Sequence, residues 1–136
     1  MSTTNQKSAL ISVYNKDRID EIAKKLTELD ISIISTGGTE KFLRNLGFKV
    51  EKVDKITEYP SIFGGRVKTL HPKVFGGILF RRIVDEDIIE KNKFEIPSID
   101  YVIVDLYPFE QTVRESKSHS EVIEKIDIGG ISLIRA

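Results

Sequence analysis

Residues 64–72, with the sequence GGRVKTLHP, concentrate side chains that bind anions and move protons. The two glycines let the backbone approach a ligand closely or adopt positive φ. Arg66 offers a planar fork of donors for a phosphate or carboxylate, and Lys68 is a compact cation. Thr69 adds a hydroxyl, and His71 adds a ring that titrates near neutral pH. The segment suits an anion site, although a solvated basic turn would have the same composition.

A second candidate segment, STGGT at residues 35–39, lies between a short apolar run and a helical pattern. A strand, a small polar loop and a helix in that order form a phosphate cradle, because free N–H groups and the helix dipole favour an anion there. The spacing matches neither a Walker A motif nor GxGxxG, so a nucleoside triphosphate or dinucleotide is not indicated. An ordinary strand-to-helix turn has the same composition, and this segment alone leaves both interpretations open.

Four further residues with useful chemistry stand beside apolar runs or glycine turns, namely Lys16, Asp105, Tyr107 and Asp127. Together with the cations of residues 64–72 they would suit a small phosphorylated substrate and proton-transfer chemistry. A serine or cysteine nucleophile paired with a histidine is not apparent, which argues against acyl-enzyme chemistry.

Composition limits the classes of function. The 136 residues are enough for one domain, and 40% are hydrophobic, which allows a sizeable core. The 21 basic and 21 acidic residues balance, which argues against a nucleic-acid binder held by bulk charge. With no Cys and two His we expect no metal site. Apolar runs fall far short of the roughly 20 residues that span a bilayer, and we expect a flexible tail at residues 1–7 and a cytoplasmic location.

The elements that must position these residues alternate along the chain. Apolar runs predict strands at 8–13, 31–34, 48–53, 74–80 and 99–106. Helical spacing and charge patterns predict helices at 19–29, 40–46, 81–94 and 121–126, with another beginning at Pro108. Asn15 or Asp17 can cap the first helix, and Gly47 can stop the second.

This alternation predicts an α/β fold with a mostly parallel sheet and helices on both faces. The run at 99–106 is the most apolar, as in a central strand covered on both faces. Ligands of such sheets bind outside the carboxyl ends of the strands, where the polar loops at 14–16, 35–39 and 105–107 fall.

Six motifs occur in order along the chain: SVxxK at 12–16, STGGT at 35–39, GRVKTLHP at 65–72, GGIL at 76–79, LYPF at 106–109 and IDIGG at 126–130. In combination they resemble the N-terminal IMP cyclohydrolase domain of the bifunctional purine biosynthesis proteins, over about residues 8–136. The resemblance implies a methylglyoxal-synthase-like fold, a three-layer α/β/α sandwich with a mostly parallel sheet. It also implies a homodimer whose full-length chain carries a C-terminal AICAR formyltransferase domain.

The implied reaction closes the ring of the purine ribotide FAICAR to inosine monophosphate (IMP) with loss of water. The carboxamide nitrogen attacks the formyl carbon. Because an amide nitrogen is a weak nucleophile, the site must orient the reacting groups, remove a proton and stabilise an oxyanion. The reaction needs neither a metal nor an organic cofactor in principle.

The resemblance also implies roles for particular residues. The catalytic residues would be Lys68, Tyr107 and Asp127. The substrate-binding residues would be Tyr14, Asn15, Lys16, Thr36, Gly37, Gly38, Thr39, Arg66, Val67, Thr69, Val104, Asp105, Ile128 and Gly129. Residues 14–16 and 36–39 would hold the ribotide phosphate. Asp105 would touch the base. Purely structural roles stay open for two residues, since Asp127 could cap the Gly-Gly turn and Tyr107 could pack in the core.

The chain departs from the family pattern at several positions. Tyr14 and Asn15 stand where many members have Ser-Asp, Asp105 replaces a common Asn and Phe75 a common His. The pattern continues past Ala136 to a lysine expected to take part in proton transfer. We therefore expect a C-terminally incomplete domain that binds a nucleotide or phosphate and turns over FAICAR poorly or not at all.

Two alternative functions belong to other classes. A methylglyoxal-synthase-like lyase would eliminate phosphate from a triose phosphate, but the RVKTLHP and LYPF segments argue against it. A non-catalytic nucleotide- or phosphate-binding module, like the regulatory domain of carbamoyl phosphate synthetase, would bind IMP without turnover.

Overall fold

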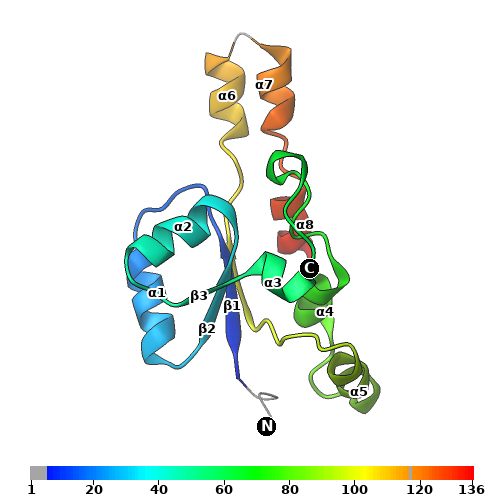
Figure 1. Ribbon diagram of the computed structural model, residues 1–136. Coiled ribbons are helices and arrows are strands. Elements are labelled where there is room, and N and C mark those ends of the chain that lie inside the picture. Colours follow the sequence, from blue (N-terminus) through cyan, green and yellow to red (C-terminus); the bar gives the residue numbers. More distant parts are fainter. Residues whose placement is uncertain (1–5, 117) are drawn as a thin grey trace.

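A parallel β-sheet runs through the centre of the computed structural model, which describes residues 6–116 and 118–136 (Figure 1). Its strands are β1 (Ser8–Ser12), β2 (Ser32–Ser35), β3 (Val50–Lys52) and β4 (Tyr101–Val104). They lie in the order β3-β2-β1-β4, and every described pair is parallel. The predicted α/β fold with a mostly parallel sheet is confirmed. Residues 1–5 of the predicted tail lie outside the described residues.

The connections between strands are mostly helical. The helices are α1 (Ile19–Glu28), α2 (Gly37–Asn45), α3 (Val53–Thr57), α4 (Pro72–Leu79), α5 (Asp85–Lys93), α6 (Phe109–Glu115), α7 (His119–Glu124) and α8 (Gly129–Arg135), with a 3-10 turn η1 (Phe63–Gly65). Gly47 ends α2 as predicted. Its φ is 92°, and the next N–H, of Phe48, donates to Leu43 O at 3.1 Å.

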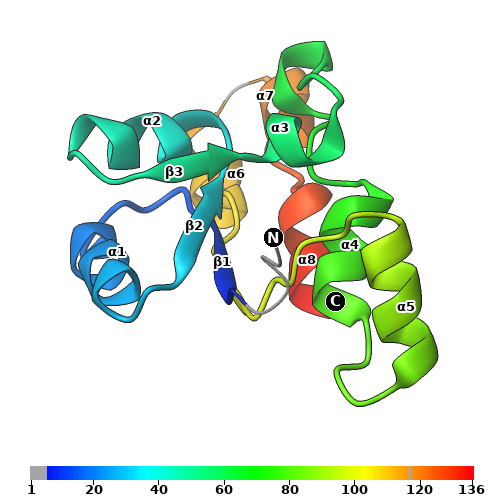
Figure 2. The same ribbon diagram turned by 60° about the horizontal axis from the view of Figure 1, so that its bottom comes forward.

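Helices cover both faces of the sheet because strand side chains alternate between them. On one face Ala9 and Ile11 pack with α1 and α2 in a cluster that includes Leu43. On the other face Leu10 and Ile34 pack in a second cluster with residues of α3, α4 and α8. Figure 2 shows the sheet between α1 and α2 on one side and α4 and α8 on the other. The three-layer α/β/α sandwich is therefore confirmed.

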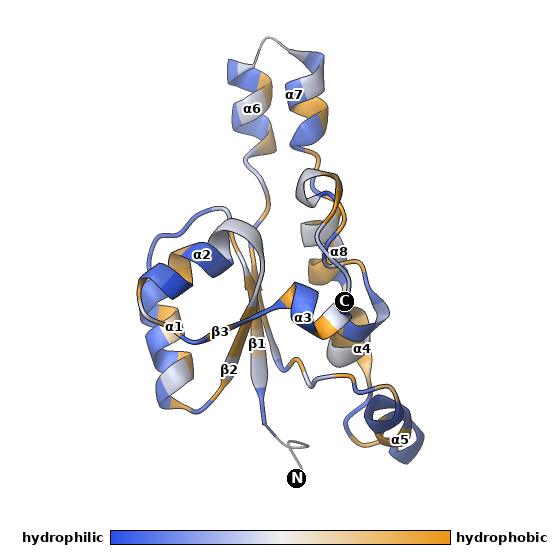
Figure 3. Ribbon diagram, viewed as in Figure 1, coloured by the Kyte–Doolittle hydropathy of each residue, from blue (hydrophilic) through white to orange (hydrophobic). Residues whose placement is uncertain are grey.

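Polarity follows the same layers. Figure 3 shows apolar strands at the centre and hydrophilic residues over α5 and the outer turns of α1. The α6 and α7 helices form a hairpin that stands away from the sheet (Figure 1). The chain segments at the base of this hairpin carry Tyr107 and Asp127.

The predicted strand at 74–80 is wrong, because Pro72–Leu79 is the helix α4. The side chain of His71 accepts a hydrogen bond from Lys73 N at 3.1 Å, and Pro72 suits the first helical turn. The glycines that looked like a softened strand permit close packing instead. A Cβ on Gly77 would lie 2.5 Å from the backbone oxygen of Pro97.

The predicted central position of residues 99–106 is also wrong. Within the described part of the chain β4 pairs only with β1, and Tyr101 is 43% exposed. The central strands are β2 and β1, and residues 8–11 of β1 are all buried. The apolar character of β4 has another cause. Ile103 packs against one core cluster and Val102 against the other, so the strand contacts both helical layers from the edge.

The remaining differences concern helix boundaries. The residue before α1 is Arg18 with φ 61°, whereas the side chain of Asn15 accepts from Asp17 N at 2.8 Å, so the predicted cap is wrong. The helix predicted at 81–94 is shorter, the one predicted at 121–126 begins two residues earlier, and the mixed region 54–63 contains most of α3. The apolar residues after 130 belong to α8.

Candidate active site

A cleft of about 470 Å³ lies beyond the carboxyl ends of the strands, as predicted for a parallel sheet. Its walls come from the loops after β1, β2 and β4, from the segment around η1, and from the chain between α7 and α8. Charged and hydroxyl side chains share the lining with an apolar wall formed by Leu70, Ile123, Ile126 and Leu133. A cleft of this size and mixed lining suits a small polar molecule.

Most of the predicted site residues line this cleft. They are Tyr14, Lys16, Thr36, Gly38, Thr39, Arg66, Lys68, Thr69, Val104, Asp105, Tyr107, Asp127, Ile128 and Gly129. The other three, Asn15, Gly37 and Val67, are described but stand outside the lining. Gly37 is nevertheless close, since a Cβ on it would lie 3.4 Å from Lys68 Nζ.

Lys16 carries its charge into the floor of the cleft. Its ammonium donates to the backbone oxygen of Val13 and, at 3.3 Å, to that of Tyr14. Burial lowers the pKa of Lys16 below its usual 10.5, the carboxylate of Asp105 opposes this, and the like charge of Lys68 adds to it. The two lysines and Asp105 therefore form one electrostatic group.

Asp105 supports the loop after β1. Its two carboxylate oxygens accept hydrogen bonds from the backbone N–H of Tyr14 and, at 2.9 Å, of Asn15. These bonds run from the end of β4 to the end of β1 and fix the loop that presents Lys16. The predicted contact of Asp105 with a base stays a prediction, but the carboxylate already has this positioning task.

The segment 36–39 forms the turn into α2, with Thr36 preceding the helix. Gly37 has φ 58°, a conformation that glycine adopts without strain. The first N–H groups of a helix lack partners within it, and Thr36, Gly38 and Thr39 at the start of α2 line the cleft. The hydroxyl of Thr39 is buried, donates to Val13 O at 3.0 Å and accepts from Val13 N at 3.1 Å. Thr39 thus joins the α2 turn to the loop after β1.

Arg66 meets a carboxylate that sequence reasoning missed. Its Nε and Nη2 donate to Glu124 Oε2 at 3.1 Å and 2.5 Å, and its Nη1 donates to Phe63 O at 2.7 Å. Glu124 lines the cleft from the last turn of α7. In the sequence it is one of several charges on a short helix, so only the fold distinguishes it.

Tyr107 and Asp127 lie near one another at the base of the α6–α7 hairpin. The Tyr107 ring packs edge-on to Tyr14 with centroids 6.2 Å apart, and Lys125 Nζ lies 5.0 Å from its centroid. Burial, then the charges of Asp127 and Glu124, raise the pKa of Tyr107 above its usual 10. Asp127 accepts from Gly130 N at 2.6 Å, which is the capping role that stayed open. Tyr107 is 39% exposed and so is not a core residue.

In the ranges 6–116 and 118–136, no three His, Asp or Glu side chains gather in a way that would hold a metal ion. None of the helices described in those ranges is long and apolar enough to cross a membrane.

A parallel α/β sandwich with a charged cleft beyond its strand ends defines a class of small-molecule-binding domains. The family model described as MGS-like domain matches residues 18–132, and the chain belongs to this family. A solved structure described as the crystal structure of ForH is similar, with a TM-score of 0.80 and 34% identity over 96% of this chain and 67% of that one.

Curated relatives are similar at higher identity. The bifunctional purine biosynthesis protein PurH of Bacteroides thetaiotaomicron is 60% identical over 130 residues, which are 96% of this chain and 26% of the relative. The PurH protein of Aquifex aeolicus is 54% identical over 94% of this chain and 25% of its own length. The chain thus spans about a quarter of the length of these relatives. They confirm the family resemblance that the six motifs indicated.

Proposed function

We propose that this domain is an IMP cyclohydrolase, which closes FAICAR to IMP with loss of water. The observation that carries the proposal is the cleft itself, because Lys68, Tyr107 and Asp127 line it together with the 36–39 turn. The similarity to bifunctional purine biosynthesis proteins supports the same substrate. A cytoplasmic location, a homodimer and a formyltransferase domain in the full-length protein are part of this proposal.

In the proposed mechanism the ribotide phosphate binds the N–H groups at the start of α2, the Lys16 ammonium and the Arg66 guanidinium. This places the carboxamide nitrogen against the formyl carbon and converts ring closure into an intramolecular step between oriented groups. As the C–N bond forms, the formyl oxygen becomes an oxyanion, which Lys68 stabilises. One proton leaves the carboxamide nitrogen and one leaves the formamide nitrogen, the formyl oxygen leaves with them as water, and a C=N bond to the formamide nitrogen completes the ring.

Tyr107 and Asp127 suit opposite ends of this proton transfer. A tyrosine whose pKa lies above 10 keeps its proton at neutral pH and can donate it to the departing oxygen. The Asp127 carboxylate keeps one oxygen on Gly130 N at 2.6 Å, which fixes its orientation as an acceptor. In this proposal Tyr107 is the proton donor and Asp127 the proton acceptor.

The test measures binding and turnover separately. Calorimetry with IMP should give a Kd for the wild type, and Lys68→Ala should weaken it at least about tenfold, since a charged contact is worth about 1.5–3 kcal/mol. Lys73→Ala is the matched control, because Lys73 belongs to the same segment but stands outside the cleft lining and pairs with Glu58 at 3.8 Å. Equal effects of the two substitutions would contradict the proposal.

Turnover is followed by the absorbance of IMP formed from FAICAR. We expect the wild type to form IMP at a measurable rate. Asp127→Asn should lower this rate by about 10²–10³, a typical cost of losing one positioned group that moves a proton. IMP binding with no turnover would favour the non-catalytic binding module instead.

A further inference from the structure

The ion pair between Arg66 and Glu124 joins two walls of the cleft that are far apart in the sequence. Arg66 follows η1, and Glu124 ends α7, 58 positions later. In Figures 1 and 2 the end of α7 lies near the segment that carries η1. Both side chains line the cleft, so the pair sits where a ligand would bind.

The fold does not depend on this pair. The side chain of Arg66 is 61% exposed and that of Glu124 48% exposed. Ion pairs this exposed contribute little to stability, because water solvates and screens both charges. A ligand can therefore break the contact at low cost.

The geometry of the pair is that of anion recognition. Nε and Nη2 of Arg66 point at one carboxylate oxygen, and this side of the guanidinium is also the fork that recognises phosphate. The Nη1 bond to Phe63 O at 2.7 Å does not involve Glu124. It keeps the guanidinium in place when the carboxylate leaves, so the freed fork stays directed at the same position.

We propose that Glu124 is an internal competitor of the phosphate, which occupies Arg66 in the free protein and is replaced on its guanidinium by the phosphate of the ligand. The inference rests on the proposed function, which supplies a ribotide as the ligand. A phosphate dianion carries about twice the charge of a carboxylate, so it can win this exchange, whereas a neutral nucleoside makes no such exchange. Glu124 therefore lowers the affinity of the cleft for phosphorylated ligands and leaves that for a neutral nucleoside unchanged.

Glu124 also acts on Tyr107. The groups that face the Tyr107 ring and hydroxyl are the carboxylates of Asp127 and Glu124, the ammonium of Lys125 and the ring of Tyr14. Removing the negative charge of Glu124 therefore makes the phenolate easier to form. A shift of the Tyr107 titration towards lower pH in Glu124→Gln would report that the two side chains lie close together in the cleft.

The test compares Glu124→Gln with the matched control Glu110→Gln, whose carboxylate pairs with Arg114 at 3.7 Å on the surface of α6. Calorimetry with IMP should show about two- to fivefold tighter binding for Glu124→Gln, because an exposed internal competitor has been removed. Inosine, which lacks the phosphate, should bind Glu124→Gln and wild type equally. In an Arg66→Ala background, Glu124→Gln should bring no gain, since the two residues act through one contact.

Nuclear magnetic resonance checks the free protein independently of any ligand. The Nε–H signal of Arg66 should move in Glu124→Gln, and IMP should move it in the wild type. Weaker or unchanged IMP binding in Glu124→Gln, or an equal gain in the Arg66→Ala background, would overturn the inference while leaving the proposed function intact.

Inorganic phosphate separates the remaining outcomes. If the wild type binds phosphate but not IMP, the proposed function fails. In that case tighter phosphate binding by Glu124→Gln would still support the exchange on Arg66, and unchanged or weaker binding would contradict it. If the wild type binds neither probe, the proposed function and the inference are both overturned.

Discussion

Asp105 shows how one carboxylate can shape a site without touching the reaction. It accepts from the N–H groups of Tyr14 and Asn15 and lies close enough to Lys16 to raise its pKa. Asp105→Ala should cost about 1–2 kcal/mol in the free energy of unfolding, because two hydrogen bonds to a charged acceptor are lost at a partly solvated position. It should also lower the pKa of Lys16 further, because the carboxylate that opposes the effect of burial is gone.

Denaturant unfolding and amide exchange at Tyr14 and Asn15 would measure these effects. Asp105→Asn should fall between wild type and Asp105→Ala, because its amide oxygen can still accept one of the two bonds. Asp17→Asn is the control, because Asp17 is an exposed carboxylate directly after the loop of residues 14–16. Unchanged exchange at Tyr14 in Asp105→Ala would show that the loop is held by other contacts.

Tyr107 makes alkaline stability depend on the cleft. Its folded pKa lies above 10, so between pH 10 and that pKa the native state holds a proton that the unfolded state has lost. Stability should therefore fall as the pH rises through this window, and Tyr107→Phe should remove that part of the fall. Lys16 has the opposite sign, because its folded pKa is lowered.

Urea unfolding at pH 9, 10 and 11 measures the Tyr107 effect as the difference between wild type and variant, in which the contribution of Lys16 cancels. Tyr59→Phe, at an exposed tyrosine outside the cleft lining, provides the matched control. A steeper alkaline fall in Tyr107→Phe than in wild type would contradict the assignment.

Residue types explain what sequence reasoning found in the cleft and what it missed. The motifs that contain Lys68, Tyr107 and Asp127 concentrate unusual polar and glycine residues, so they stood out individually. Glu124 belongs to an ordinary charged helix, and its partner Arg66 is 58 positions away. Pairings of that kind depend on the tertiary fold, which local patterns do not contain.

At the scale of elements, the helix α4 depends on a glycine. A Cβ on Gly77 would lie 2.5 Å from Pro97 O and 3.0 Å from a side-chain carbon of Ile99. Gly77→Ala gains about 1 kcal/mol of helix propensity, but overpacking against backbone typically costs about 1–3 kcal/mol or more. Because the 2.5 Å contact involves a backbone atom, we expect the cost to win, with a net loss of about 2 kcal/mol.

Gly76→Ala is the matched control on the same helix. Its added Cβ would lie 3.0 Å from Ile96 Cδ1, the movable end of a side chain, so it should be neutral or stabilise by up to about 1 kcal/mol. Thermal unfolding of both variants measures the contrast. A Gly77→Ala variant as stable as Gly76→Ala would mean that the segment carrying Pro97 can move away.

The same helix explains why one predicted strand was wrong. Residues 74–80 are apolar with two glycines, and short apolar runs do not distinguish a strand from a buried helix. The deciding signals were His71 and Pro72, a capping side chain and a first-turn proline that precede the run. In α1 and α2 apolar residues recur at spacings of three and four over a longer stretch. The existence of these helices could therefore be predicted, although the cap of α1 could not.

At the scale of the whole molecule, topology brings the site together. Because the strands are parallel, in the order β3-β2-β1-β4, the carboxyl ends of β1, β2 and β4 lie on the same side of the sheet, where the cleft is found. The alternation of strands and helices was sufficient to predict this architecture and the position of the cleft beyond the carboxyl ends of the strands. The strand order was not predictable, because the apolar run of β4 reads as central although it packs between two helical layers from the sheet edge.

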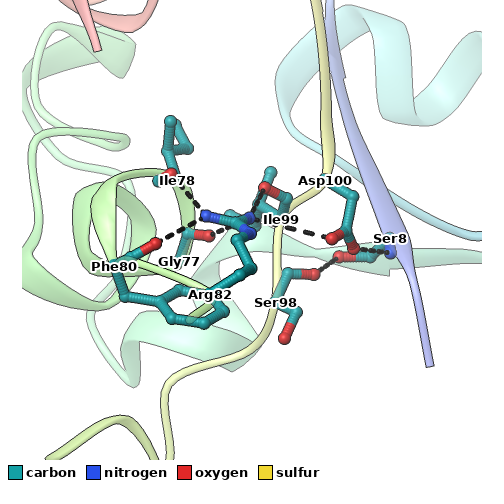
Figure 4. A network of polar contacts seen from close by, with 8 residues as sticks. All are labelled: Ser8, Gly77, Ile78, Phe80, Arg82, Ser98, Ile99 and Asp100. Atoms are coloured by element: carbon teal, nitrogen blue, oxygen red, sulfur yellow. Dashed lines mark hydrogen bonds and ion pairs between the residues drawn. The ribbon is translucent and has the colours of Figure 1, made fainter. Parts of the chain in front are cut away.

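At the amino ends of the strands, opposite the cleft, Arg82 connects α4 to the sheet, and Figure 4 shows its network of polar contacts. Its guanidinium donates to the backbone oxygens of Ile78 and Phe80 at 2.9 Å and 2.8 Å, and of Gly77 and Ile99 at 3.2 Å and 2.8 Å. It also lies 3.7 Å from Asp100, whose other oxygen accepts from Ser8 N at 3.1 Å. One side chain thus joins the end of α4 to the beginnings of β4 and β1.

Arg82→Met should lower the free energy of unfolding by about 2–4 kcal/mol, because helix-end carbonyls lose their donors while the apolar stem is kept. Arg82→Lys should recover only part of this, since an ammonium cannot reproduce the planar fork. Arg81→Met is the control, because the Arg81 side chain is 68% exposed and donates to one carboxylate, Asp87, a contact that should be worth about 1 kcal/mol. Denaturant unfolding should therefore separate the neighbours, while the Kd for IMP stays unchanged in all three variants, since the network lies away from the cleft. A loss of IMP affinity in Arg82→Met would show instead that the contacts of Arg82 at the amino ends of the strands affect the cleft at their carboxyl ends.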